Sequence, residues 1–142
     1  MIRTLREYEG CTATLCVDSY TQGVPRGFLF HSFLGPVPFG SLTDLLVRME
    51  TILEESGAPQ SYMVPRRFED VLPVRLPELS SPRIHRGNLA TFSLQICYRR
   101  NASWQGRLFW RERGDTQSFR SVLELVVLLD SALRSAERGN AV

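Results

Sequence analysis

Two segments of the chain carry the spacing of apolar residues that is typical of an amphipathic helix. Residues 39–53 read FGSLTDLLVRMETIL, and residues 119–133 read FRSVLELVVLLDSAL. In both segments apolar residues recur three and four positions apart, which places them on one face of a helix. Glycine commonly follows the last turn of a helix. We therefore expect the first helix to stop near residues 55–57 and the second to run from about residue 122 to 137.

The starts of both helices carry the same capping pattern. Ser41 and Ser121 each precede an apolar stripe, and the acids Asp44 and Glu124 follow three residues later. A serine hydroxyl can accept a hydrogen bond from a backbone N–H of the first turn, and an acid suits the positive end of the helix. The pattern predicts that each helix begins directly after its serine.

Alternating apolar and polar residues precede both helical segments and predict two hairpins. Residues 12–18 alternate, a turn-forming stretch follows, and residues 28–33 return. Later in the chain residues 92–98 alternate, and residues 107–113 return after a second turn. Period-two alternation is typical of a strand with one buried face. The order strand, strand, helix therefore occurs twice, which favours an internal duplication.

This order predicts a single domain of the α+β class. A length of 142 residues corresponds to about one domain. We expect a first β-β-α unit over about residues 11–55, a connector over 56–88 and a second unit over about 89–137. A four-stranded antiparallel sheet with both helices packed on one face would bury both apolar stripes.

The connector is rich in proline, which disfavours regular helix. Its prolines are Pro59, Pro65, Pro73, Pro77 and Pro82. Leu72, Val74 and Leu76 alternate and are compatible with a short edge strand, the kind of strand that tolerates proline. Two interpretations of the segment stay open, namely a surface crossover between the two units and an arm that docks on a partner.

The second predicted helix is apolar on an additional face. Its positions outside the main stripe include Leu123, Val127 and Leu128. The equivalent residues of the first helix are Thr43, Val47 and Arg48. Because an apolar helix surface has to be covered, either the rest of the chain or a second subunit is expected to bury it. A homo-oligomer or another protein partner is thus predicted, with Leu123, Val127 and Leu128 as candidate interface residues.

The second half is also basic. Residues 83–113 hold seven arginines and one acid, Glu112. If Leu108 and Trp110 face the helices, the alternating neighbours lie on the opposite face of the sheet. The candidate residues of this basic face are Arg99, Arg107, Phe109, Arg111 and Arg113. Arginine with an exposed aromatic ring suits RNA or single-stranded DNA, although the net charge of the chain is only +2.

Composition limits the remaining classes of protein. Apolar residues make up 43% and charged residues 23%, which is near the average for globular proteins. The longest strongly apolar run, residues 122–129, is too short to cross a bilayer. The first ten residues carry charges where a signal peptide needs an apolar core. We therefore expect a cytoplasmic protein that does not bind membranes.

Neither catalysis nor metal binding is indicated by a sequence motif. Cys11, Cys16 and Cys97 lack metal-binding spacing, and we expect three reduced thiols. His31 and His85 lie in no recognised nucleophile signature, and the chain contains no GxGxxG, no P-loop and no HExxH. The prediction is a protein that is not an enzyme, without catalytic residues, cofactor or metal.

One short motif resembles a ligand-binding signature. The segment from Asn101 through Ser103 to Gly106 has the form [DN]xSxxG, which resembles the second signature of the PilZ family of cyclic-dinucleotide receptors. In that family a preceding RxxxR supplies arginines that hold the ligand. Here the nearest upstream pair, Arg83 and Arg86, forms RxxR instead, and the β-β-α order differs from a PilZ barrel. Ser103 and Gly106 are therefore interpreted as turn residues.

The segment from NASWQG to SFRSVLELVVLLDSAL resembles a group of small proteins from gut Clostridia that have no assigned activity. The resemblance covers mainly residues 90–133 and more weakly residues 39–53. It implies a cytosolic bacterial setting and no particular chemistry.

The leading hypothesis from sequence is a non-enzymatic protein-interaction or regulatory module that self-associates. A nucleic-acid-binding protein that uses the basic sheet face is the alternative. A sensor of a cyclic dinucleotide or another small ligand is less favoured than either.

Overall fold

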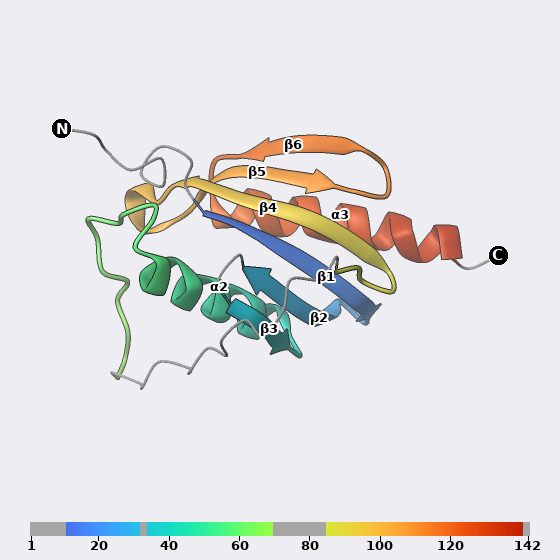
Figure 1. Cartoon of the computed structure of the whole chain (residues 1–142), viewed down its shortest axis with the longest axis horizontal. Coiled ribbons are helices and arrows are strands. Elements are labelled where there is room, and N and C mark those ends of the chain that lie inside the picture. The colour runs from blue at the N-terminus through green and yellow to red at the C-terminus, as the bar shows by residue number, and fades with distance from the viewer. Residues whose placement is uncertain (1–10, 32–33, 70–84, 141–142) are drawn as a thin grey trace.

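A computed structural model describes residues 11–31, 34–69 and 85–140 of the chain (Figure 1). The described part of the first half contains β1 (Cys11–Thr21), β2 (Val24–His31), β3 (Leu34–Phe39) and α2 (Leu42–Ser56). The described part of the second half contains β4 (Ala90–Tyr98), the short 3-10 helix η1 (Arg100–Ala102), β5 (Gln105–Trp110), β6 (Asp115–Phe119) and α3 (Val122–Asn140).

The six strands form one antiparallel sheet in the order β3-β2-β1-β4-β5-β6. Both long helices lie behind this sheet in Figure 1, so the opposite face is turned toward the viewer. Leu45 and Met49 of α2 and Leu125 and Leu129 of α3 are buried against the inward-facing residues of the strands. The predicted α+β class, with an antiparallel sheet and two helices packed on it, is confirmed.

Each half contains three strands, whereas the sequence predicted two. The additional strands are β3 and β6, the two edges of the sheet. β3 contains Pro36 and Pro38, which argue against an interior strand, and β6 reads DTQSF with one buried residue, Phe119. An edge strand pairs on one side only, so it tolerates proline and needs no alternating pattern. The return strand β5 also ends at Trp110 instead of continuing to residue 113.

The two halves share the register of their strands. Gly27 of β2 pairs with Phe39, and Gly106 of β5 pairs with Phe119. A Cβ atom at either glycine would lie 1.9 Å from a carbonyl oxygen of the neighbouring strand, β1 or β4. Both central strands also contain an irregularity at the same place relative to these glycines. The halves thus have the same order and register, and their origin by duplication stays a prediction.

The predicted starts of both helices and the end of α2 are confirmed at atomic level, whereas α3 continues past the predicted end near residue 137 to Asn140. The backbone N–H of Asp44 donates to the hydroxyl of Ser41 at 3.0 Å, and that of Glu124 donates to Ser121 at 3.2 Å. Each acid accepts a hydrogen bond from the residue before its serine, at 3.1 and 2.8 Å. Gly57, with a φ of 70°, ends α2 in the left-handed conformation that glycine adopts most easily.

The connector is described only at its two ends. Residues 57–69 contain no helix or strand, and Leu89 donates a backbone hydrogen bond to Val17 at 2.9 Å where the chain enters β4. The predicted short strand through Leu72, Val74 and Leu76 lies outside the described residues. In the part of the chain that is described, neither long helix has the length and hydrophobicity needed to cross a membrane.

Alanine at Gly27 or at Gly106 should destabilise the fold by about 2 kcal/mol or more, because the new methyl group overlaps a neighbouring backbone. Gly40→Ala is the matched control, since a Cβ atom there meets only the Asp44 carboxylate at 3.8 Å. Urea unfolding of the three variants measures the difference. Equal stability of all three would show that the strands do not approach one another so closely.

Candidate functional site

Arg99 lies inside the protein and not on the basic face predicted from sequence. It is 6% exposed and forms ion pairs with Glu50 and Glu54 of α2, the second at 2.5 Å. It also donates to the carbonyl oxygen of Pro59 at 3.3 Å, while the indole of Trp104 donates to Glu50 at 2.7 Å. Arg99 therefore ties the start of the β4–β5 connection to the C-terminal part of α2, and its assignment to a binding face was wrong.

A matching contact holds the other helix. Tyr20 stands at the position of β1 that corresponds to Arg99 after β4, and its hydroxyl donates to Asp130 of α3 at 2.5 Å. Partial burial and then this hydrogen bond raise the pKa of Tyr20 to about 12. Hydrogen bonds from Tyr20 and then from Arg134 hold the pKa of Asp130 below its usual range. Asp130 of α3 thus binds Tyr20 of β1, and its counterpart Glu50 of α2 binds Arg99, the residue directly after β4.

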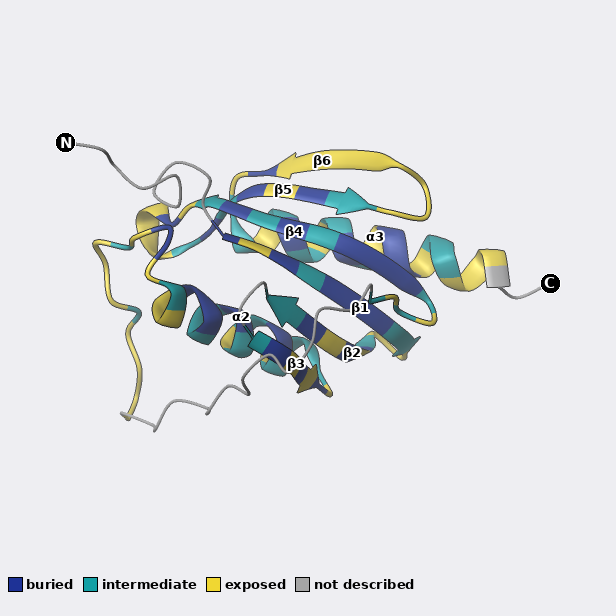
Figure 2. Cartoon of the chain, in the orientation of Figure 1, coloured by how far each residue is buried: buried dark blue, intermediate teal, exposed yellow. Residues whose placement is uncertain are grey.

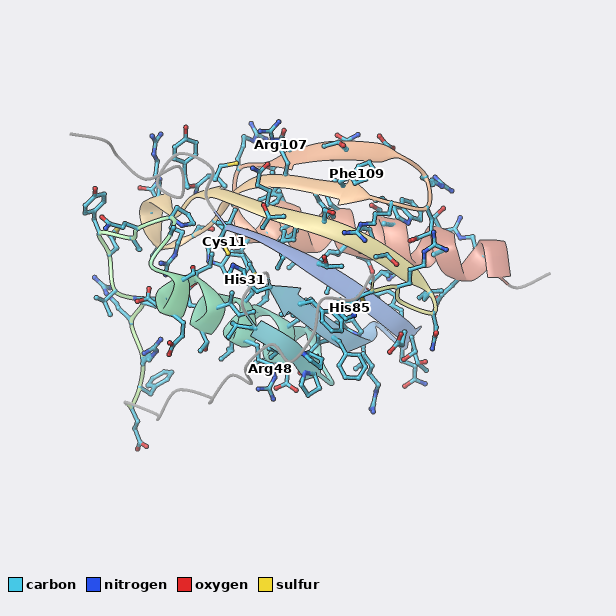
Figure 3. All side chains as sticks on the ribbon, in the orientation of Figure 1. Cys11, His31, Arg48, His85, Arg107 and Phe109 are labelled. Atoms are coloured by element: carbon cyan, nitrogen blue, oxygen red, sulfur yellow. The ribbon has the colours of Figure 1, made fainter. Side chains whose placement is uncertain are left out.

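Three of the five predicted basic-face residues do share the face opposite the helices. Arg107 is exposed and Phe109 is half-buried on β5 (Figure 3). Arg111 extends over the middle of the sheet, where its guanidinium donates to Ser93 and Thr14 at 3.3 Å each. Because these two hydroxyls hold it, Arg111 braces the centre of the sheet as well as adding positive charge.

Arg113 points to the helix side and was wrongly placed on the open face. Its guanidinium lies 4.5 Å from the centre of the Trp110 ring and donates to the hydroxyl of Ser135 of α3 at 2.6 Å. The turn after β5 reverses the chain at Gly114, whose φ is 63°. Strand alternation therefore ends at Trp110, and Arg113 no longer follows it.

The candidate interface on α3 is exposed at two of its three positions. Leu123 is 72% and Val127 is 59% exposed, one helical turn apart. Leu128 is half-buried and packs against the core. Other residues of this chain therefore cover part of Leu128, whereas the described residues leave Leu123 and Val127 mostly exposed.

A hollow of about 310 Å³ opens beside Leu128, between α3 and the strands β5 and β6. Its apolar residues are Phe92, Leu108, Trp110, Leu128 and Ala132. Its polar residues are Arg113, Asp115, Gln117, Ser131 and Ser135. An apolar floor with a few polar groups at the rim is the usual composition of a binding site, and the volume is at the lower end of the range for such sites.

A comparison with the equivalent residues of the first half explains why this hollow is not filled by side chains. Val37 and Ile52 of the first half are almost completely buried. The strand register and the helix caps make Gln117 and Ala132 their equivalents. Gln117 is exposed, and alanine has a smaller side chain than isoleucine. The second half therefore lacks two apolar side chains that fill the corresponding region of the first half.

The edge strand beside this hollow is open. Pro38 of β3 lies opposite Phe28, and it has no N–H to donate in either direction. Its equivalent on β6 is Ser118, which lies opposite Arg107. Arg111 donates its backbone N–H to Thr91 on the β4 side. By alternation Arg107 and Phe109 also bond to β4, so their partners Ser118 and Thr116 direct their backbone groups away from β5. No strand of the described residues lies beyond β6, which is exposed along most of its length (Figure 2).

Proline therefore blocks one edge of the sheet, and the other edge retains its donors. The β6 edge and the hollow beside it form what we call the β6 groove, defined by Thr116 and Ser118 and by the residues that line the hollow. The sequence interpretation missed this groove. The contrast between LGPVPF and DTQSF at equivalent positions was the signal that pointed to it.

The residues of the PilZ-like motif have structural roles. Ser103 accepts a hydrogen bond from the backbone N–H of Val122 at 2.9 Å, which connects the β4–β5 turn to the start of α3. Asn101, with a φ of 57°, forms the turn itself. Gly106 permits the close approach of β4, and Arg83 lies outside the described residues.

The three cysteines are free thiols, two of them buried. The buried ones are Cys11 and Cys16, and Cys97 is half-buried. Burial raises the pKa of Cys16 to about 11, which disfavours the thiolate form that reacts. Among residues 11–31, 34–69 and 85–140, no three side chains of histidine, cysteine or acid type are grouped closely enough to hold a metal ion.

Arg99→Ala should lower the free energy of unfolding by about 2–3 kcal/mol, because Glu50 stays partly buried without its charged partner. Arg107→Ala, a substitution on the exposed face, should change it by less than about 0.5 kcal/mol. Guanidinium-induced unfolding distinguishes the two variants. A neutral effect of Arg99→Ala would contradict the structural role assigned to this residue.

No protein-family model matches the chain, and comparisons with curated proteins and with solved structures found no match either. A functional proposal therefore depends on the surfaces described above. Of these, the β6 groove combines unpaired main-chain groups with a hollow of side-chain size.

Proposed function

We propose that this protein is a non-enzymatic protein-interaction module that binds an extended polypeptide segment in the β6 groove. The observation that carries the proposal is the open β6 edge beside a hollow, at a place where the equivalent edge in the first half carries proline. Adding a strand to a sheet edge satisfies main-chain donors and acceptors on both partners. Pockets beside the edge then select the side chains of the added strand.

In this mode the backbone groups of Thr116 and Ser118 form the main-chain hydrogen bonds. Side chains of an antiparallel or parallel neighbour strand alternate between the two faces of the sheet. Every second side chain of the bound segment therefore points to the helix side, where Gln117 borders the hollow. A large apolar side chain at that position reaches Leu128 and Trp110 and displaces water from them.

The other surfaces support binding less strongly. Leu123 and Val127 are two exposed aliphatic side chains, and single exposed apolar residues are common on protein surfaces. The nucleic-acid alternative retains Arg107, Phe109 and Arg111 on one face, while Arg99 and Arg113 contribute to neither stacking nor phosphate contacts there. We therefore propose protein binding as the function.

Replacing Ser118 with proline should abolish binding, because it removes an outward donor as Pro38 does on the other edge. The probe is a random heptapeptide library displayed on phage, selected on immobilised full-length protein. Wild type should enrich a family of peptides, and the synthesised consensus peptide should bind S118P at least tenfold more weakly. Circular dichroism and thermal unfolding check that the variant keeps its fold.

Pro38→Ser is the matched control, since it restores a donor on the opposite edge and leaves the β6 groove intact. It should bind the consensus peptide as tightly as wild type does. Failure to enrich any peptide, or equal binding by wild type and S118P, would refute the proposed function.

A further inference from the structure

The first part of the connector exposes large apolar side chains. Tyr62 is 94% and Val64 is 85% exposed, Met63 is also exposed, and Phe68 is exposed completely. These residues lie within eight positions of sequence, in a stretch without helix or strand. A contiguous group of exposed apolar residues marks a surface that another molecule covers.

The chemistry of this segment fits an added strand. The arm contains an aromatic, a flexible and a β-branched residue in succession, namely Tyr62, Met63 and Val64. Aromatic and β-branched residues favour extended backbone, and Pro65 ends the stretch. A local contact between Ser61 and Met63 holds the backbone there, because the Ser61 hydroxyl donates to the Met63 carbonyl oxygen at 2.8 Å and accepts from the Met63 N–H at 3.3 Å. Docking as a strand exchanges this contact for main-chain hydrogen bonds. We call residues 61–68 the connector arm.

The arm starts far from the β6 groove of its own chain. Arg99 binds the carbonyl oxygen of Pro59 and so fixes the base of the arm beside α2. In Figure 1 the arm extends from the end of α2, in green, away from β6. A neighbouring molecule can present its arm to the groove without this restriction.

We propose that the β6 groove of one copy binds the connector arm of a second copy. The inference rests on the proposed function, because it names the segment that the groove accepts. Tyr62 and Val64 lie on one side of an extended arm, so they enter the hollow beside Leu128 in alternation. The arm carries Arg66 and Arg67. The lining of the groove carries Asp115, which offers one carboxylate to the arm, and Arg113, which is held by Trp110 and Ser135.

Reciprocal exchange of two arms gives a closed dimer with two identical contacts. The prolines of β3 block strand addition at the other edge of the sheet, so binding of the arm is confined to the β6 edge. The same arrangement covers the exposed arm and fills the hollow. It assigns the connector the role of a docking arm rather than of a simple crossover.

Sedimentation of the full chain over a range of concentrations tests the proposal. Wild type should form dimers, and Tyr62→Ser combined with Phe68→Ser should weaken the dimer at least tenfold. Ser118→Pro should weaken it to a similar extent. Val47→Ser is the matched control, because Val47 is also an exposed apolar residue but lies on α2, and it should leave the dimer unchanged.

A synthetic peptide with the sequence of residues 59–69 provides an independent probe. It should bind the full-length Tyr62→Ser, Phe68→Ser variant, whose groove is intact and unoccupied, and S118P should not bind it. Ala132→Ile, which introduces the residue of the first half, should weaken peptide binding at least tenfold. Gln117→Val is a second filling variant at an exposed position, in case the first perturbs folding.

The results distinguish this inference from the proposed function. A monomer at all concentrations, together with failure of the 59–69 peptide to bind, overturns the role of the arm. If library peptides still bind wild type and not S118P, the groove keeps its function with another partner. A dimer that persists unchanged in S118P and in the arm variant likewise overturns the inference and indicates a different interface, such as Leu123 and Val127.

Discussion

Pairing of β1 with β4 at the centre of the sheet is the contact on which the rest of the structure depends. Each strand starts a half of the chain, and Thr14 lies opposite Ser93 at the midpoint of the pairing. Residue pairs at equal distances on either side, such as Cys11 with Ile96 and Val17 with Ala90, correspond to one another. Because the halves join through equivalent strands, their helices come to lie on the same face and bury one shared core.

Two polar contacts reinforce this central pairing from the helix side. Arg99, directly after β4, binds Glu50 of α2, and Tyr20 of β1 binds Asp130 of α3, so each half is tied to the helix of the other near the end of its first strand. The buried residues of both halves, from β1 to α3, belong to one hydrophobic core, so neither half buries its apolar residues alone. The two halves therefore form one cooperative unit rather than two small domains.

The candidate site arises where the halves differ within this common framework. Pro38 on β3 lacks a backbone N–H, whereas its equivalent Ser118 on β6 has one. Ala132 on α3 leaves space beside the sheet, whereas its equivalent Ile52 on α2 fills it. One edge is blocked and its helix flank filled, while the other edge is open and its flank hollow. A further strand can therefore be added at the β6 edge and not at the β3 edge.

The sequence by itself determined the elements whose causes are local. The starts of α2 and α3 follow from a serine and an acid three residues apart, and the inner strands follow from alternation within a few positions. The edge strands escaped prediction because Pro36 and Pro38 disfavour a strand at β3 and because four of the five β6 residues are exposed, which removes the apolar alternation there.

Only the tertiary structure decided which residues of the candidate site come together. Arg99 was predicted to be exposed, but its partners Glu50 and Glu54 lie 49 and 45 positions earlier in the chain, beyond the reach of any local pattern. Arg113 left the open face because a turn at Gly114 ended the alternation, and the hollow depends on side chains from β4, β5, β6 and α3. Local spacing determines the elements, and packing between distant segments determines the surfaces that they share.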